Sequence, residues 1–352
     1  MIKVTNMNDK ILSVVIPTYN MERLLPRCLN SLLEPQKTDS LEILVVNDGS
    51  KDNSLKIAKA YEEKYPNIVK VIDKPNGNYG STINKGIEVA SGKYFKILDS
   101  DDFYVNSNLI KLVEKLKGTN ADLVFTNYRR DKGKISVLFR PSQINYDKIS
   151  SFDTLNLSNV VNFAMHGIAY KTSILKNNAI ELSTGISYTD SEYCFYPLPF
   201  IKTYIAYDLT IYCYQLGRFG QTVNLSSQIK SISHMFRIID RMYNDIKNRD
   251  FSIPSTIKQR KVFCDIINLC FSTILCYEKT NTYLEKLSLM DNKVCKVPGV
   301  KEVLLKCNMF GVKFYRRYHF FQKTSNSGLF TLYYNLVKII SYIIYNVRIL
   351  IK

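Results

Sequence analysis

Three aspartates follow an apolar segment in KYFKILDSDDFYV, residues 93–105. The first half of this stretch predicts a buried strand, because tyrosine, phenylalanine, isoleucine and leucine favour sheets. Asp99, Asp101 and Asp102 come next, and carboxylates this close repel one another. Their oxygens suit Mg²⁺ or Mn²⁺, which bind through one or two carboxylates and substrate phosphates. In an extended chain Asp99 and Asp101 would share one face and Asp102 the other. A solvated loop that caps the next helix is the alternative.

The usual glycine-rich phosphate loops are missing from the sequence. No GxGxxG follows the first expected strand, and GxxxxGK[ST] occurs nowhere. A dinucleotide site or a P-loop would need one of these backbones. A nucleotide bound by this chain therefore needs its phosphate charge neutralised in another way, and a cation on the acidic loop would do so.

Short strands and helices alternate through the first third of the chain. Strands are expected at 11–16, 41–46, 68–72 and 93–98, and helices at 21–33, 54–65, 81–91 and 107–117. This alternation predicts βαβ units and a mostly parallel sheet flanked by helices, in the α/β class. Ligands of such sheets bind beyond the carboxyl ends of the strands. Polar residues follow the strands at these ends: Thr18, Tyr19, Asn20, Asn47, Asp48 and the three aspartates.

The composition is that of a basic globular protein. The chain has 352 residues, 46% hydrophobic and 22% charged, with a formal net charge of +17. Residues 293–352 hold 11 Lys and Arg against one Glu. A basic end of this kind indicates an anionic surface such as phospholipid headgroups, or else solubilising charge. No nucleic-acid motif accompanies it, so no nucleic-acid partner is expected. The eight cysteines form no CxxC, which predicts reduced thiols without a zinc site.

The C-terminal segment 329–352 is strongly apolar. Lys338 and Arg348 interrupt it, so no charge-free run reaches the roughly 18 residues of a spanning helix. Segment 313–323 combines basic and aromatic residues, which suits a membrane interface, while a core helix is the alternative for 329–352. The N-terminus lacks a signal-peptide layout. We expect a cytoplasmic protein with peripheral contact to the inner face of the cell membrane.

Four motifs resemble the family 2 glycosyltransferases, inverting enzymes of the GT-A fold, of the bacterial surface-polysaccharide type. They are VVIPTYN (14–20), VVNDGSKDNS (45–54), NGNYGSTINKG (76–86) and SGKYFKILDSDD (91–102). The resemblance covers about the first 110 residues and implies a nucleoside-diphosphate sugar donor with Mn²⁺ or Mg²⁺ at a D-x-D motif. It implies that the 17–20 loop and Asp48 hold the base and ribose, Asp48 accepting from the N3–H of uracil. The donor would then be a UDP-sugar.

The resemblance extends to individual residues. The donor-binding residues that it implies are Pro17, Thr18, Tyr19, Asn20, Asp48, Asn84, Asp101, Arg218 and Gln221, and the metal ligands come from Asp99, Asp101 and Asp102. Many members have Arg before the Asn of the third motif, whereas this chain has Ile83 before Asn84. The cation on the phosphates would then come from elsewhere, such as Lys85 or Arg218.

Two later segments resemble the acceptor side of the family. TGISYTDSEYCFYPL (184–198) matches its later acidic motif, and inverting transfer needs one base for the acceptor hydroxyl. We predict Asp190 as this base, with Glu192 in reserve and a helix cap as the alternative. YCYQLGRFGQTV (212–223) resembles a Y-x-x-G-R-x-G-Q segment that would place Arg218 on the diphosphate and Gln221 on hydroxyls, or form a simple turn. His166 lies in the same half, as a substrate contact or a structural residue.

The predicted organisation is a GT-A domain at 1–225 and a helical region at 226–352. Its nucleotide half spans about 10–118 and its acceptor half about 119–225. The predicted reaction adds a single sugar, because the chain lacks tryptophan and the Q-x-x-R-W of processive members. The expected acceptor is a lipid-linked glycan for capsule or another surface polysaccharide. A degenerate, membrane-bound scaffold is the alternative. A sugar-phosphate nucleotidyltransferase would carry a glycine-rich basic loop where PTYNMERLL stands.

Overall fold

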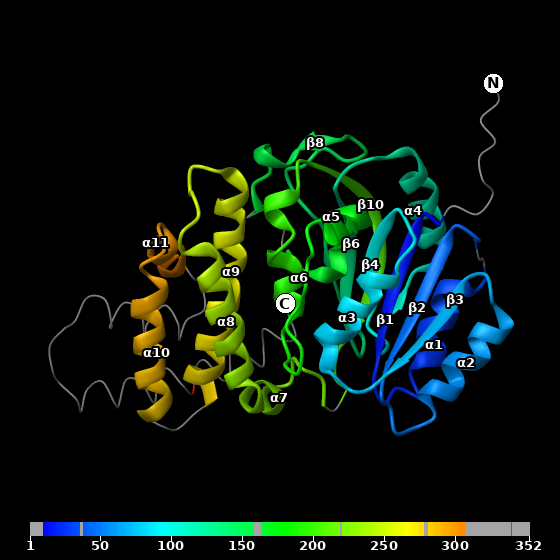
Figure 1. Cartoon of the computed structure of the whole chain (residues 1–352), viewed down its shortest axis with the longest axis horizontal. Helices are drawn as coiled ribbons and strands as arrows, with labels where there is room; N and C mark the ends of the chain where they lie inside the picture. The colour runs from blue at the N-terminus through cyan, green and yellow to red at the C-terminus, as the bar shows by residue number, and fades with distance from the viewer. Residues whose placement is uncertain are drawn as a thin grey trace, which may run out of the picture. The chain divides into compact units, whose positions relative to one another are not determined.

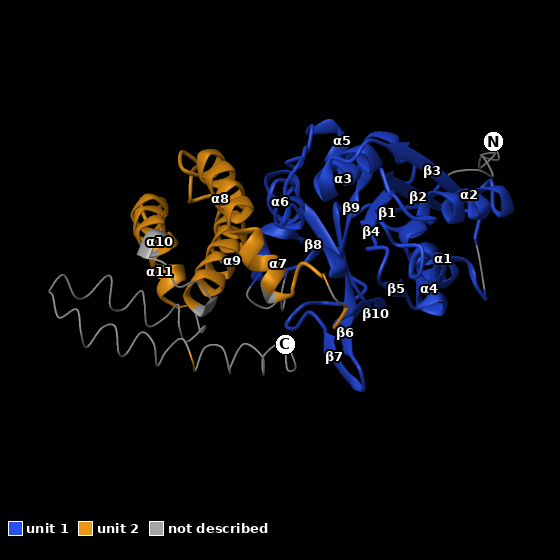
Figure 2. Ribbon diagram, turned by 90° about the horizontal axis from the view of Figure 1, so that it is seen from below, with its two compact units in different colours: residues 1–216 blue, residues 217–352 orange. Residues whose placement is uncertain are grey.

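The computed structural model describes residues 10–35, 38–157, 163–218, 220–277, 281–306 and 339. It divides into two compact units, residues 1–216 and 217–352 (Figure 2). The boundary predicted near 225 lies a few residues further along the chain and stays a prediction.

One ten-stranded sheet organises the first unit (Figure 1). Its first four strands are parallel in the order β3-β2-β1-β4: β1 (Leu12–Thr18), β2 (Leu41–Asp48), β3 (Val69–Lys74) and β4 (Tyr94–Ile97). Every residue of β1 is buried, as expected of a parallel strand covered on both faces. The carboxyl ends of these four strands therefore meet at one edge, as the sequence predicts.

The second half of the sheet is mixed. β9 (Ile168–Lys171) pairs antiparallel with β4 and with β6 (Leu123–Lys132), while β10 (Thr203–Gln215) runs parallel to β6. The short β5 (Phe103–Tyr104) and β8 (Ser150–Ser151) pair with β10, and β7 (Ile135–Phe139) pairs with β6. The α/β class with a mostly parallel sheet is confirmed. The pairing of β5 with β10 brings the acidic segment against a strand more than 100 residues away in the sequence.

Helices cover both faces of this sheet. They are α1 (Leu25–Leu33), α2 (Ser54–Lys64), α3 (Asn78–Val89), α4 (Asn106–Gly118), α5 (Thr172–Asn177) and α6 (Asp190–Phe195), with 3-10 turns η1 (Phe152–Thr154), η3 (Met165–Gly167) and η4 (Leu198–Phe200). Val14 and Ile16 of β1 join the core formed with α1 and α4. Val15 points the other way and meets Gly86 of α3, where an added Cβ would lie 2.6 Å from its methyl groups. Gly86 thus lets α3 pack directly on β1.

The second unit is helical, as predicted from residue 226 onward. Its helices are α7 (Leu225–Lys230), α8 (Ile232–Ile246), α9 (Pro254–Tyr277), α10 (Asn281–Val294) and α11 (Val300–Leu305). Among the residues described, no helix is both long and apolar enough to cross a bilayer. Segments 313–323 and 329–352, which carry the membrane prediction, lie outside the described residues apart from position 339.

Candidate active site at the carboxyl edge of the sheet

The loops that follow β1 and β2 are joined to each other. The Asn20 amide donates to Ser50 Oγ at 3.0 Å, and Asn20 Oδ1 accepts from the Lys51 amide at 2.7 Å. Asn20 has φ 55°, a left-handed conformation that asparagine tolerates better than most residues. The two predicted donor-binding loops therefore form one continuous rim. Of the other residues predicted here, Pro17 and Thr18 are buried, and Tyr19 is 46% exposed.

Asp48 lies buried at the end of β2. Its Oδ1 accepts from Lys74 Nζ at 2.6 Å and from the Gly77 amide at 2.9 Å. Lys74 Nζ also donates to Ser81 Oγ at 2.9 Å. The carboxylate predicted to recognise a base is thus fixed by a lysine that the sequence reasoning missed. The position of Lys74 could have indicated this role, because Lys74 is the last residue of β3 and so lies at the same edge of the sheet as Asp48.

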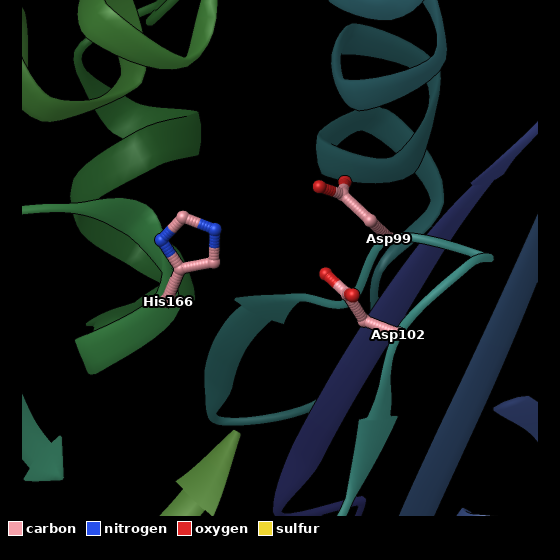
Figure 3. A group of neighbouring side chains, drawn as sticks. All are labelled: Asp99, Asp102 and His166. Carbon is pink, nitrogen blue, oxygen red and sulfur yellow. The ribbon is translucent and has the colours of Figure 1, made fainter. Parts of the chain in front are cut away.

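The acidic segment forms a turn instead of an extended strand end. The Asp102 amide donates to the Asp99 carbonyl at 3.0 Å and closes the turn. The expectation that Asp99 and Asp102 face opposite ways is therefore wrong. Carboxylate oxygens of these two residues and a ring nitrogen of His166 all lie within 4.8 Å of one another (Figure 3). Asp101 is outside this group, and its main-chain carbonyl accepts from Arg27 at 2.6 Å.

Two tyrosines hold the acidic turn in place. Tyr212 of β10 donates its hydroxyl proton to Asp102 Oδ2 at 2.6 Å, and its oxygen accepts from the Asp99 amide at 3.2 Å. The Gln215 amide donates to the other oxygen of Asp102 at 2.7 Å. Tyr79 of α3 donates to Asp99 Oδ1 at 2.8 Å. The turn is therefore fixed by elements on both sides of it.

The electrostatics of the turn favour a bound cation. Desolvation, and then the charge of Asp101, raise the pKa of Asp99 to about 8 and hold the pKa of Asp102 well above its usual range. Burial holds the pKa of His166 well below its ordinary value, so its imidazole is neutral and keeps a lone pair for a ligand. Two carboxylates and a neutral imidazole form a donor set that fits a divalent cation.

The imidazole of His166 has a fixed orientation. It stacks with Tyr128, at 5.3 Å between ring centroids, and with Tyr214, at 4.7 Å, and meets Tyr212 edge-on at 4.7 Å. The main-chain carbonyl of His166 accepts from the buried Lys96 Nζ at 2.8 Å. The ring is therefore held in one place, facing the two carboxylates (Figure 3).

The two candidate bases have different surroundings. Asp190 is the first residue of α6, and its charge raises the pKa values of Asp99 and Tyr79, which places it near the acidic turn. Desolvation raises the pKa of Asp190 itself, as suits a general base. Glu192 is fully buried and accepts from the amide and hydroxyl of Ser183 at 2.6 and 2.9 Å. Both oxygens of Glu192 are thus engaged by Ser183, and the role of Asp190 as base stays a prediction.

Asn84 is engaged with the main chain. Its Nδ2 donates to the Leu182 carbonyl, and its Oδ1 accepts from the Leu182 amide, both at 2.8 Å. This pair joins α3 to the segment that leads to α6, so a contact with the donor stays a prediction. Lys85 forms an ion pair with Glu88 at 2.6 Å on the same helix.

Arg218 and Gln221 belong to the second unit. Gln221 Oε1 accepts from the amides of Gly217 and Arg218, both at 3.0 Å. Gly217 and Gly220 have φ values of 104° and 80°, which favour glycine. The segment thus forms the tight loop expected of it, and the contacts predicted for Arg218 and Gln221 with a donor or acceptor stay predictions.

Comparisons with known proteins show which family the first half of the chain matches. Residues 13–181 match the glycosyl transferase family 2. A poly(ribitol-phosphate) beta-glucosyltransferase of Bacillus spizizenii is 30% identical over 186 residues, 51% of this chain and 28% of that protein. An uncharacterized glycosyltransferase, the MG025 homolog of Mycoplasma pneumoniae, is 42% identical over 98 residues, 27% of this chain and 32% of that protein. The matches span less than half the length of these relatives.

A solved structure matches nearly the whole chain. The S. aureus TarS fragment 1–349, in complex with UDP-GlcNAc, superposes with a TM-score of 0.62 at 18% identity, covering 94% of this chain and 89% of that one. At this identity the likeness concerns the fold, which is of the GT-A type. The comparisons thus identify residues 13–181 as a glycosyl transferase family 2 domain.

Proposed function

We propose that this chain transfers a single sugar, with inversion, from a UDP-sugar to an acceptor hydroxyl, with Mn²⁺ or Mg²⁺. The start of α3 is the observation that carries this proposal. Gly77 donates to the predicted base-binding carboxylate of Asp48, and Tyr79, two residues later, donates to Asp99 of the acidic turn. One short segment, residues 77–79, therefore contacts both the carboxylate that would bind the base and the acidic turn that would hold the diphosphate through its cation.

The donor side would use the rim formed by the first two loops. Asp48 would accept from the N3–H of uracil, with residues 17–20 around the base and ribose. Asp101 would face the ribose or the sugar, and Arg218 the diphosphate, where a guanidinium fork suits phosphate oxygens. The TarS structures with UDP-GlcNAc and with UDP support a uridine nucleotide for a chain of this fold.

The acceptor side would use Asp190. A bound divalent cation would neutralise the diphosphate as it leaves. Asp190 would take the proton from the acceptor hydroxyl while that oxygen attacks C1 from the face opposite UDP, which inverts the anomeric centre. The partly desolvated position of Asp190 beside the acidic turn supports this assignment.

For the acceptor we propose a lipid-linked glycan of a capsular or other surface polysaccharide. The B. spizizenii relative is named for a poly(ribitol-phosphate), which supports a polymer as the acceptor. The basic and aromatic residues at 313–323 would hold the chain at the inner face of the cell membrane.

The test compares Asp190→Asn with Glu192→Gln in a UDP-release assay. A panel of UDP-sugars is offered with water, polyol-phosphate polymer or lipid-linked glycan as acceptor. Asp190→Asn should lower kcat by roughly 10²- to 10⁴-fold without changing the affinity for UDP, because only the proton transfer is lost. Glu192→Gln should chiefly lower the melting temperature. Full turnover by Asp190→Asn would remove Asp190 from the role of base.

A further inference from the structure

We propose that His166 is the third ligand of the cation site and gives it a preference for Mn²⁺ over Mg²⁺. The sequence places only the aspartates there. This inference rests on the metal-dependent transfer proposed above, and it concerns which protein atoms hold the ion.

The spacing of the three groups suits one ion. Mg²⁺ lies about 2.1 Å from its ligands and Mn²⁺ slightly further, so two ligands on opposite sides of such an ion lie about 4 Å apart. The ligand atoms of Asp99, Asp102 and His166 all lie within 4.8 Å of one another. Within the described part of the chain, no hydrogen bond joins the imidazole directly to either carboxylate. The three groups therefore converge without satisfying one another.

His166 supplies an observation independent of the acidic cluster. The residue is only 8% exposed, and its Nδ1, on the ring edge away from the carboxylates, has no hydrogen-bond partner within the described structure. Nε2 is the ring nitrogen turned toward the carboxylates (Figure 3). The rings of Tyr128 and Tyr214 stack against the imidazole. Its edge is turned toward the two carboxylates (Figure 3). Buried polar groups are normally paired, and a cation beside the two carboxylates would give the Nε2 of this imidazole a partner.

The carboxylates already carry the outer hydrogen bonds that metal ligands have. Asp102 accepts from the Tyr212 hydroxyl and the Gln215 amide, and Asp99 accepts from the Tyr79 hydroxyl. Each ionised carboxylate has about four lone-pair sites, so further lone pairs stay available for an ion. Such outer donors orient ligating carboxylates and are typical of metal centres.

A nitrogen ligand sets the metal preference. Mg²⁺ prefers oxygen ligands and retained waters, whereas first-row transition metals accept imidazole, with affinity rising from Mn²⁺ to Co²⁺. The wild-type site should therefore bind in the order Mg²⁺, Mn²⁺, Co²⁺, from weakest to tightest. The variant His166→Gln offers an amide oxygen at this position and should reduce the difference in affinity between Mn²⁺ and Mg²⁺.

The test uses Mn²⁺ and the full chain. Electron spin echo spectroscopy of protein-bound Mn²⁺ should show coupling to an imidazole ¹⁴N, and His166→Phe, which keeps a stacking ring, should abolish it. A titration that follows the spectroscopic signal of free Mn²⁺ measures the affinity of the protein for the ion. This affinity should be about 10- to 100-fold weaker in His166→Phe than in the wild type. His234→Gln, on α8, is the matched control and should behave as wild type.

The outcomes separate this inference from the proposed reaction. Bound Mn²⁺ without nitrogen coupling, or equal affinity in His166→Phe, would overturn the role of His166 whatever the transfer activity. Nitrogen coupling that disappears in His166→Phe would support it even if no UDP-sugar is consumed. UDP release by a protein that binds no Mn²⁺ would overturn the inference and leave the transfer standing.

Discussion

Tyr212 connects the acidic turn to β10 through one hydroxyl group. That hydroxyl donates to Asp102 and accepts from the Asp99 amide. Tyr212→Phe leaves both groups without this partner, so we expect metal affinity to fall about 10-fold or more. Mn²⁺ titration measures this effect. The free energy of unfolding should also fall, by about 1–3 kcal/mol.

Tyr104→Phe is the matched control for this prediction. Tyr104 is as buried as Tyr212, packs against it at 5.6 Å between ring centroids, and donates its hydroxyl to the Ile97 carbonyl at 3.0 Å. The control should lower stability similarly but leave Mn²⁺ affinity unchanged. Equal Mn²⁺ affinity in the two variants would show that Tyr212 has a purely structural role.

The candidate site residues were easier to predict from the sequence than the residues that hold them in position. Asp48, the aspartates at 99–102 and Asp190 could be named from motifs, because those residue types are rare in buried positions and recur at recognisable spacing. Lys74, Tyr79 and Tyr212 could not, because their roles depend on which strands and helices become neighbours. Tyr212 lies 110 residues from its partner Asp102. The sequence around either residue therefore does not indicate that the two side chains are in contact.

At the scale of elements, α3 positions both sides of the site. Its first turn bonds the acidic turn, and Gly80 packs so closely on the segment before α6 that an added Cβ would overlap the Ser183 carbonyl oxygen. That segment leads to Asp190. Gly80→Ala should therefore lower the free energy of unfolding by about 1–3 kcal/mol and slow UDP release, because overpacking displaces the segment.

Gly118→Ala, at the end of α4, is the control for this helix substitution. Nothing lies within 4 Å of the Cβ that it adds. Alanine favours helix by up to about 1 kcal/mol over glycine, so stability should stay equal or rise and turnover should not change. Urea denaturation and the UDP-release assay measure both effects. A Gly80→Ala variant as stable and active as Gly118→Ala would refute the close packing of α3.

The strands and helices of the first third could be predicted from the sequence, but the start of α1 and the acidic turn could not. The alternation of the first third predicts every strand from β1 to β4 within about two residues at each end. The helix expected from residue 21 begins at Leu25, because amides of residues 24 and 25 bond the Met21 carbonyl in a separate turn. The acidic turn was missed because a strand pattern does not show where the chain reverses.

For the whole molecule, the sequence indicates a family but not a substrate. Family motifs gather in the first 110 or so residues, whereas the sugar and the acceptor would be chosen by later, more individual segments. The net charge of +17 indicates an anionic environment without identifying it. The tail that carries much of this charge lies outside the described residues.

The most direct test is the melting temperature with UDP, GDP, CDP and dTDP, each with Mn²⁺ or EDTA. A ligand that binds only the native state at 100 times its Kd stabilises it by about 2.7 kcal/mol. We predict a clear rise in melting temperature with UDP and Mn²⁺, and little change with EDTA or with the other nucleotides. An unchanged melting temperature in all conditions, or equal rises with every nucleotide, would contradict a metal-dependent UDP-sugar transferase.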